Sequence, residues 1–497
     1  METPQPVDGI ELHADDWDGT PESVQPFVLS LLSENRDLKT RLSLLEEQVK
    51  QNSQNSSRPP SGDGFGKPKP APSKPEKRQR GGQPGHGGHE RHLYEESAIT
   101  GMEHHLPRVC KACGTALSGV DGEPYRHQRV EVPPIVPQVM EYRLHALECP
   151  HCGQKTRASL PATVATGTYG ERLSALVAWL SSDYRQSHGQ LQQLCKRLFG
   201  IEISRASINR LRQDMSQALA PVVAAAHEYA QAQPQVHRDE TSFPQGNGDG
   251  RNPQVQQGWL WVLVTPTVTV FEVALSRGQA MAQHMIGTAD RGIVIADRYS
   301  GYRWLDTHQR QVCWAHLKRD FTAMAERRGV SQVIGQALLD RQQRFFRWWH
   351  RVRDGTMSRA LFQTAVAALR QGLQAAWATA AALPIATKEK SPLAKTVRTC
   401  QQMLKLEAAL WAFVDPPGVE PTNNAAEQAL RPAVIWRRTS FGSQSEAGSQ
   451  FVARMLSVVT SLKAQKRDVW DFLTLVCQAA RFDLPMPSLI PLDTPSP

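Results

Sequence analysis

Long apolar runs are missing from this sequence. No stretch reaches the roughly 18 consecutive apolar residues from which a membrane-spanning helix is built. The opening residues, METPQPVDGIELHADDWDG, are acidic where a secretory signal would carry an apolar segment. We therefore expect a cytoplasmic protein with no membrane partner.

Cysteine and acidic charge are also sparse. Eight cysteines in 497 residues are expected to be thiols or metal ligands in a reducing compartment, which argues against disulfides. Lys and Arg number 57 against 48 Asp and Glu, and the net charge of +9 favours an acidic partner such as nucleic acid. A chain of this length is too long for one core and predicts about three domains.

A seven-residue repeat of apolar side chains runs through residues 24–50. The a positions are Val28, Asn35, Leu42 and Val49, and the d positions are Leu31, Leu38 and Leu45. A single Asn at an a position fixes the register of a two-stranded coiled coil. The repeat predicts a dimerisation helix, with a lone amphipathic helix docked on the protein as the alternative.

Residues 51–95 read as a disordered basic linker. They are rich in Pro, Gly, Ser and Lys and have too few apolar side chains to form a core. Between Arg58 and Arg91 lie eight basic and three acidic residues. Such an arm either rides on DNA phosphates or is simply solvated.

Two C-x-x-C-G motifs follow, Cys110-Lys-Ala-Cys113-Gly and Cys149-Pro-His-Cys152-Gly. The spacing lets two thiolates hold one tetrahedral Zn²⁺, and the glycine lets the backbone turn beneath it. We expect a zinc ribbon over 105–160 with a β hairpin over 125–149. A redox motif or coincidence is the alternative. The scattered cysteines are expected to be core or surface thiols: Cys195, Cys313, Cys400 and Cys477.

Residues 168–230 have a helical pattern with a helix-turn-helix cadence. One amphipathic helix ends at Gly200, and a second begins near Ser204 with SRASINRLRQ. Because the second helix carries Arg205 and Arg210, it suits a reader of the DNA major groove. An ordinary helical hairpin is the alternative.

Two carboxylates stand at the ends of predicted strands. QVHRDETSF reads as a strand ending near Asp239, residues 258–275 as a hairpin turning at Thr265-Pro266, and residues 293–296 as a buried strand followed by Asp297. In an α/β sheet such ends lie side by side. Two neighbouring carboxylates repel unless a cation lies between them, and Mg²⁺ prefers oxygen ligands.

A third carboxylate, Glu427, lies in PTNNAAEQALRP (421–432). With Asn424 as the N-cap, Glu427 would be the N3 residue of a capping box. The residues alone leave a helix cap and a catalytic carboxylate both open. The intervening residues 313–417 read as an α-helical insertion, in which Trp348 and Trp349 are expected to pack in the core, with stacking on a DNA base as the alternative.

Seven motifs, in this order, resemble those of the transposases of the insertion sequence 66 group, which are DDE transposases. They are NSSRPPSGDG, GGQPGHGG, the C-x-x-C pairs, HRDETSF, ADRYSGY, CWAHLKRDF and TNNAAEQALRP. The resemblance implies a multidomain α/β protein with an RNase H-like catalytic core over 231–312 and 418–482. The helical insertion interrupts this core, and the coiled coil, zinc ribbon and helix-turn-helix-like region precede it.

The resemblance also implies chemistry and partners. Asp239, Asp297 and Glu427 would bind two Mg²⁺ or Mn²⁺ ions, water would free a 3′-OH at the element end, and that hydroxyl would attack target DNA. The implied partners are double-stranded DNA, a second copy of the chain or a larger homo-oligomer, and small companion proteins, at the bacterial nucleoid. Candidate phosphate contacts, with solvated charge as the alternative, are Lys318, Arg319, Arg431, Arg437 and Arg438.

Three residues near these motifs raise separate questions. His316 would orient phosphate or water, or is a structural histidine. Gln428 stands where many relatives have Arg, so that one phosphate contact is missing. Arg238 would bind DNA or point off the other face of its strand.

An inactive DNA-binding relative is the main alternative to a transposase, and a structure-specific nuclease ranks last.

Overall fold

The computed structural model describes residues 17, 19–51, 56–57, 92–287 and 292–491. Most of the expected basic linker therefore lies outside the described residues. The chain divides into two parts, one of Met1–Phe65, Tyr142–Gln193 and Ile203–Pro497, the other of Gly66–Glu141 and Leu194–Glu202. None of the described helices has the length and apolar character needed to cross a bilayer.

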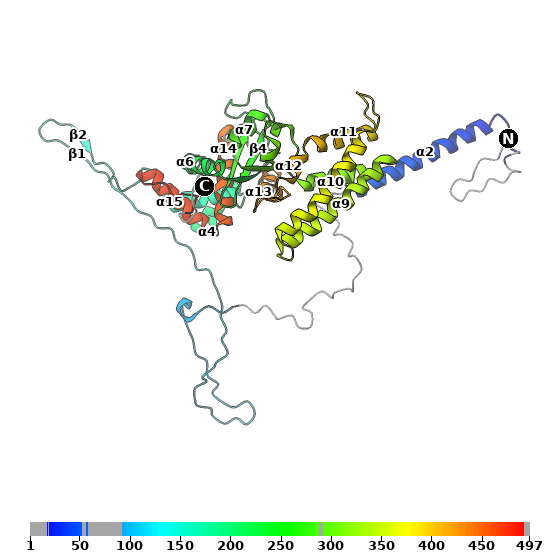
Figure 1. Cartoon of the computed structure of the whole chain (residues 1–497). Coiled ribbons are helices and arrows are strands. Elements are labelled where there is room, and N and C mark those ends of the chain that lie inside the picture. The colour runs from blue at the N-terminus through cyan, green and yellow to red at the C-terminus, as the bar shows by residue number, and fades with distance from the viewer. Residues whose placement is uncertain (1–16, 18, 52–55, 58–91, 288–291, 492–497) are drawn as a thin grey trace. The chain divides into compact units, whose positions relative to one another are not determined.

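A five-stranded mixed sheet forms the centre of the first part (Figure 1). Its strands, in the order β5-β4-β3-β6-β7, are β3 (Gln235–Ser242), β4 (Trp259–Val264), β5 (Thr269–Ala274), β6 (Ile293–Ala296) and β7 (Arg310–Val312). The first three are antiparallel neighbours, whereas β6 and β7 run parallel to β3. The expected hairpin is confirmed, because Thr265 N–H donates to Val268 O at 2.9 Å to close the turn after β4.

The two faces of β3 pack against different helices. Asp239 and Thr241 point to the side covered by α13 (Asn424–Ser440), which we name the front face. Arg238 and Glu240 point to the back face, where Arg238 Nη1 donates to Ala282 O of α7 (Gln279–Ile286) at 2.9 Å. Helix α6 (Ala220–Gln231) contacts both α7 and β5.

Helix α14 (Glu446–Ala464) covers the outer edge of β5. Ser457 Oγ accepts a hydrogen bond from Phe271 N–H at 2.8 Å, and Ser461 Oγ accepts one from Thr269 N–H at 2.9 Å. Both serines are buried. Since unpaired N–H groups at a sheet edge attract other strands, these hydroxyls close that edge of the sheet. Helix α15 (Val469–Phe482) packs beside α14 and against α3 (Glu171–Ser182).

Residues between β7 and α13 form the expected helical insertion. Its helices are α8 (Trp314–Ala325), α9 (Val330–Arg353), α10 (Arg359–Ala381), α11 (Pro392–Lys405) and α12 (Glu407–Trp411). An apolar core of its own includes the packed rings of Trp314, Phe345, Trp411 and Phe413. Ile295 of β6 and Val312 of β7 belong to the same core, so the insertion is joined to the sheet by apolar contacts.

The helix-turn-helix cadence is confirmed as local structure. Helix α4 (His188–Phe199) ends before Gly200, whose φ of +65° is readily adopted by glycine. Helix α5 (Arg205–Ala218) begins after Ser204, whose side chain caps it by accepting a hydrogen bond from Ser207 N–H at 3.0 Å.

The two cysteine motifs fold into the same turn. In the first, Cys110 N–H donates to Thr115 O and Gly114 N–H to Cys110 O; in the second, Cys149 and Gly153 make the same pair of bonds. The glycine φ angles are +74° and +73°. The expected hairpin over 125–149 is wrong for 125–145, which has no strand. The regular pairing instead surrounds the second motif, as β1 (Ala146–Glu148) and β2 (Lys155–Arg157).

The N-terminal repeat forms one continuous helix, α2 (Gln25–Lys50). Apart from Val28, which is half-buried, its heptad side chains lie open to solvent, with exposed fractions of 61% at Leu38, 58% at Leu42 and 57% at Leu45. The helix is therefore present, and its apolar stripe is available to a partner.

Candidate active site

Asp239 and Asp297 lie level with each other on neighbouring strands. The parallel register pairs His237 of β3 with Ile295 of β6. Asp239 comes two residues after His237, and Asp297 comes two residues after Ile295. Because side chains two residues apart share one face of a sheet, both carboxylates point to the front face. The expected end of the strand near Asp239 needs correction. β3 continues to Ser242 because it stays paired with β4, while its pairing with β6 ends at His237.

Glu427 lies on the first turn of α13 but does not cap it. The N-cap is Asn423, not Asn424, and its side chain makes no capping bond. The expected capping box is therefore wrong. The physical reason is that Asn423 binds β3 instead: its Nδ2 donates to Arg238 O at 2.6 Å, and its Oδ1 lies 3.3 Å from His237 Nδ1.

The carboxylate of Glu427 faces two basic side chains of α8. Its Oε1 lies 3.6 Å from both His316 Nδ1 and Arg319 Nη2. This oxygen is buried and has no hydrogen-bond partner among the residues that the structure describes, and the same holds for His316 Nδ1. Because a buried polar atom without a partner is costly, the arrangement suits a ligand that would satisfy it.

The electrostatics of the three carboxylates are coupled. Burial, together with the charges of Glu240, Asp297 and Glu427, raises the pKa of Asp239 to about 8. Burial and the charge of Arg319 hold the pKa of His316 below its ordinary value, against the opposite effect of Asp297 and Glu427. A bound cation would relieve the repulsion among the carboxylates and leave His316 a neutral imidazole. The residues therefore fit a divalent metal.

Cys313 was expected to be an ordinary thiol, and it lies at this site. Its Sγ accepts a hydrogen bond from Asn423 N–H at 3.1 Å, and its ligand atom, like those of His316 and Glu427, lies within 4.8 Å of the other two. Burial raises the pKa of Cys313 to about 11, so it is a neutral thiol that positions the start of α13. The C-x-x-H spacing of Cys313 and His316 is the signal in the sequence that would have found it.

Arg238 is buried on the back face, on the opposite side of β3 from Asp239. Its guanidinium lies 4.4 Å from the centre of the Trp261 ring and 4.7 Å from that of Tyr302. Glu240 beside it accepts hydrogen bonds from Arg277 and from Tyr302 Oη. This network fixes the short helix η3 (Ser300–Tyr302) that follows Asp297 and so supports the front face from behind.

Comparison with known proteins gives the family. A family model described as "Transposase IS66 family" matches residues 166–451, more than half of the chain and the span that holds all three carboxylates. The chain belongs to the IS66 transposase family. Residues 107–153 match the zinc-finger binding domain of transposase IS66, and residues 17–92 match a family of unknown function (DUF6444). The resemblance stated from the motifs is thereby confirmed.

Three relatives of this IS66 family chain come from Sinorhizobium fredii (strain NBRC 101917 / NGR234). The uncharacterized protein y4qI is 25% identical over 405 residues, which cover 75% of this chain and 70% of the relative. The uncharacterized proteins y4hP and y4jD are 24% and 21% identical, over 73% and 75% of this chain and 68% and 74% of their own lengths. The family assignment supports transposase and DNA-binding roles, and the zinc-finger match supports a structural zinc.

The cysteine motifs of the IS66 family chain suit that zinc. A hydrogen bond from the Thr115 side chain lowers the pKa of Cys113, and one from the Cys152 backbone lowers the pKa of Cys149. Since the thiolate is the form that binds metal, both turns favour the metal-binding state of their cysteines. The other four cysteines are buried, as expected for core thiols.

The basic side chains expected to contact DNA fall into two groups. Arg319 faces Glu427, and Arg437 Nη1 donates to Thr241 Oγ1 at 3.1 Å and Ser242 Oγ at 2.7 Å, which joins α13 to β3. These two guanidinium groups are already engaged within the protein. The remaining candidates are exposed: Arg205, Arg210, Lys318, Arg431 and Arg438.

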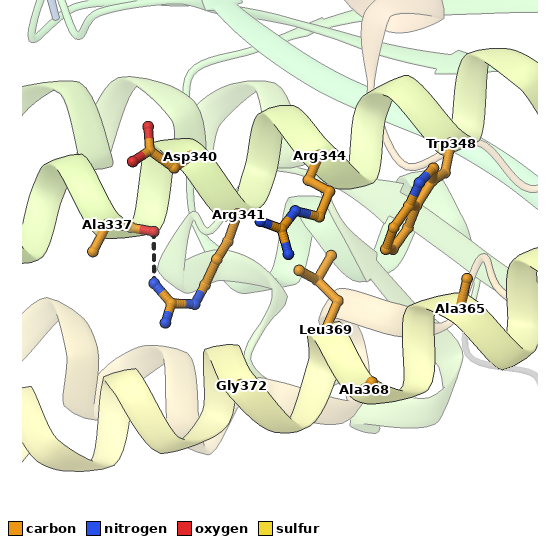
Figure 2. A pocket seen from close by; sticks show the side chains of 9 residues that line it. All are labelled: Ala337, Asp340, Arg341, Arg344, Trp348, Ala365, Ala368, Leu369 and Gly372. Carbon is orange, nitrogen blue, oxygen red and sulfur yellow. Dashed lines mark hydrogen bonds between the residues drawn. The ribbon is translucent and has the colours of Figure 1, made fainter.

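A separate groove lies between α9 and α10 of the insertion. Figure 2 shows Arg341, Arg344 and Trp348 from α9 facing Leu369 and small residues of α10. Trp348 is half-buried at this groove, whereas Trp349 is buried and donates from Nε1 to Glu420 Oε2 at 3.1 Å. The expectation of core packing is confirmed for Trp349.

Proposed function

We propose that this chain is a DNA transposase that binds the ends of its mobile element and catalyses metal-dependent phosphodiester hydrolysis and strand transfer. Asp239, Asp297 and Glu427 are its catalytic carboxylates. The observation that carries the proposal is electrostatic: the charges of Asp297, just after β6, and Glu427, on α13, both act on Asp239 of β3, inside the region that matches the IS66 transposase family.

The topology of the sheet supports an RNase H-like core. The first three strands of such a core form an antiparallel meander, and the last two lie parallel to the first strand on its other side. The order β5-β4-β3-β6-β7 has this arrangement, with a helical insertion between β7 and α13. The carboxylates then occupy the central strand, the end of its parallel neighbour and a helix on the same face.

The carboxylates would hold Mg²⁺ or Mn²⁺, which supplies activation of the attacking oxygen and stabilisation of the leaving oxygen when bound. Asp239 provides an oxygen ligand from β3, and Asp297 provides one from the residue that follows β6. Glu427 completes the set from the first turn of α13, whose position Asn423 and Cys313 fix by direct hydrogen bonds. No Ser or Tyr nucleophile is needed, since water and then a DNA 3′-OH are the attacking groups.

His316 and Arg319 have positioning roles in this scheme. Both lie 3.6 Å from Glu427 Oε1 and come from consecutive turns of one helix face. Arg319 neutralises Glu427 before metal and DNA bind, and neutral His316 presents a ring nitrogen to the site. The exposed Lys318 and Arg431 lie on α8 and α13, where they would contact DNA phosphates. Arg205 and Arg210 would contact DNA from α5.

The decisive experiment compares wild type with Glu427→Gln on labelled DNA carrying the element ends, with Mg²⁺ or Mn²⁺. Glu427→Gln keeps the size of the side chain and removes its charge, so cleavage should fall by at least about 100-fold while DNA binding is retained. The matched control is Glu446→Gln, since Glu446 also lies on the first turn of a helix but outside the site.

Two other outcomes of this cleavage experiment would contradict the proposal. Equal cleavage by wild type and Glu427→Gln would remove Glu427 from the catalytic set. DNA binding without cleavage by the wild type, in either metal, would favour the alternative of a catalytically inactive DNA-binding relative.

A further inference from the structure

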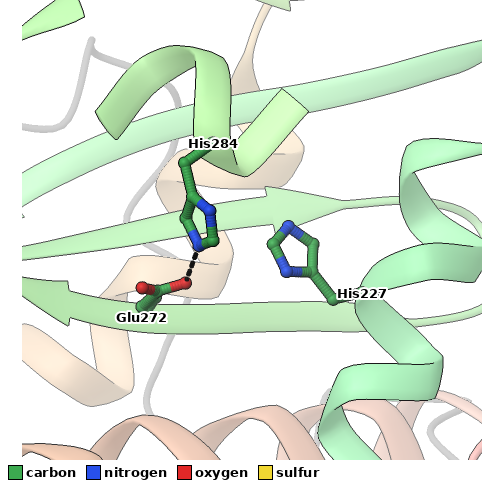
Figure 3. A group of neighbouring side chains, drawn as sticks. All are labelled: His227, Glu272 and His284. Atoms are coloured by element: carbon green, nitrogen blue, oxygen red, sulfur yellow. Dashed lines mark hydrogen bonds and ion pairs between the residues drawn. The ribbon is translucent and has the colours of Figure 1, made fainter. Parts of the chain in front are cut away.

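A second cluster of metal-ligating side chains lies far from the cysteine motifs in the sequence. It consists of His227 on α6, Glu272 on β5 and His284 on α7, whose ligand atoms all lie within 4.8 Å of one another. Figure 3 shows the two imidazole rings and the carboxylate turned toward a common point. Three separate elements of the fold therefore supply one side chain each.

Internal contacts already orient these side chains. His284 Nε2 lies 2.9 Å from Glu272 Oε2, and His227 Nε2 lies 2.9 Å from Met285 O. Gln231 Nε2 also lies 3.2 Å from His227 Nε2, but it has two hydrogens and donates to His284 O at 2.8 Å and to Met285 O at 3.2 Å. Because a carbonyl oxygen can only accept, the contact with Met285 O assigns the proton of His227 to Nε2 and leaves a lone pair on Nδ1. A histidine that binds a metal through one ring nitrogen commonly donates from the other to a backbone carbonyl, as His227 does.

The cluster is distinct from the three catalytic carboxylates. Antiparallel register places Glu272 opposite Trp261, and Trp261 opposite Glu240, so these three side chains share one face of the sheet. Glu240 points to the back face and Asp239 to the front. The sheet itself therefore separates the cluster from the catalytic side.

From this geometry we infer that His227, Glu272 and His284 form a binding site for a divalent transition-metal ion, with Zn²⁺ as the best-suited ion. Two imidazole nitrogens and one carboxylate oxygen are ligands of the type that Zn²⁺ accepts, whereas Mg²⁺ prefers oxygen alone. With three protein ligands, the fourth position is left to water. The inference does not depend on the proposed transposase activity.

Access and placement both suit such a site. The side chains of His284 and Glu272 are 55% and 38% exposed, so an ion can enter from solvent. Bound there, the ion would join α6, β5 and α7. Helix α7 also accepts the Arg238 hydrogen bond and contacts η3, which follows Asp297. By holding α7 in place, the ion would stabilise the back-face contacts of Arg238 and η3.

The test titrates Zn²⁺ into the full chain, with its cysteine motifs already loaded with zinc. A Glu427→Gln background disables two competing sites on the front face, the three carboxylates and the group of Cys313, His316 and Glu427. Calorimetry should show one further equivalent of Zn²⁺, and thermal unfolding should shift upward as it binds. In His284→Gln and in Glu272→Gln, affinity should fall at least about 10- to 100-fold, the loss seen when even an outer partner of a metal ligand is removed.

The control is His308→Gln, which removes an exposed histidine elsewhere and should leave the further equivalent intact. Unfolding in the absence of metal shows whether each variant keeps its fold. No further equivalent in the parent protein would overturn the inference, as would equal affinity in His284→Gln and Glu272→Gln. In that case His284 and Glu272 are only an ion pair between α7 and β5.

Discussion

The surroundings of Asp239 disfavour the ionised form of its carboxyl group as long as no cation is bound. Its pKa rises from 3.8 to about 8 through burial and the neighbouring carboxylates. A group with a raised folded-state pKa contributes stability that is complete below the unfolded value and is lost as the pH rises through the folded value. In the metal-free protein, the free energy of unfolding should therefore decline between about pH 4 and pH 8.

Asp239→Asn tests this directly. The amide cannot ionise, so at pH 8 without metal the variant should be more stable than wild type by about 1 kcal/mol or more, because one pKa unit corresponds to about 1.4 kcal/mol. Urea unfolding at pH 5 and pH 8 with a chelator measures the difference. Asp214→Asn, at an exposed position on α5, is the control. A pH-independent difference would contradict the coupling.

Two adjacent asparagines offer a second residue-scale test. Asn423 is fully buried and binds both β3 and Cys313, whereas Asn424 is exposed. Asn423→Ala should cost about 1–3 kcal/mol, because it leaves Arg238 O without its side-chain donor. Asn424→Ala should stay within about 0.5 kcal/mol. Chemical denaturation checks both, and equal effects would restore Asn424 as the capping residue.

At the scale of elements, α2 carries an exposed apolar stripe with the heptad spacing that predicts pairing with a second helix. If two copies pair through it, Leu38→Glu places a charge in the seam and should weaken dimerisation at least tenfold. Ser33→Glu is the matched control, because Ser33 occupies the outward f position of the same heptads. Sedimentation velocity over a range of concentrations gives the result. A dimer that survives Leu38→Glu would place the contact elsewhere.

Much of the element layout could be predicted from local patterns. The strand before Asp297, the hairpin at Thr265 and the break at Gly200 follow from short-range preferences, and the structure has each of them. The zinc-region hairpin was misplaced because alternating residues over 125–145 resemble a strand although they have no packed face.

The candidate site was predictable only in part. The strand-end position of Asp297 is a local feature, so the sequence could indicate it. Asn423, Cys313 and the back-face partners of Arg238 act through contacts between residues more than 20 positions apart, and no local pattern reports these. The capping-box pattern at Asn424 and Glu427 predicted the wrong N-cap residue. The helix instead starts after Asn423, whose side chain makes a tertiary contact with β3.

At the scale of the whole molecule, the cysteine region contrasts with the sheet. Within the fully described stretch 92–160 no side chain is buried, and Val120 and Tyr125 are 97% and 92% exposed. Apolar burial cannot hold such a region, so its order should depend on zinc.

Loss of the cysteine-bound zinc should therefore affect the cysteine region and leave the sheet unaffected. In Cys110→Ser, residues 117–145 should become rapidly cleavable by protease, while the sheet unfolds at the wild-type temperature at the same zinc concentration. Ser118→Ala should keep the protease resistance of the wild type. Limited proteolysis with mass spectrometry, alongside calorimetry, checks the outcome. A common loss of both regions would show that they unfold together.

The three carboxylates are spread widely along the chain, and the first and the last are 188 positions apart. A ribosome therefore makes α2, both cysteine motifs and α5 long before it reaches Glu427. Under the proposed roles, a chain released before α13 would keep α2 and pair with full-length copies, yet it would lack the third carboxylate as well as the helices α14 and α15, on which α3 and α5 pack. Early termination would then produce an antagonist of the complete protein, so the frequency of unfinished translation would itself limit how often the element moves.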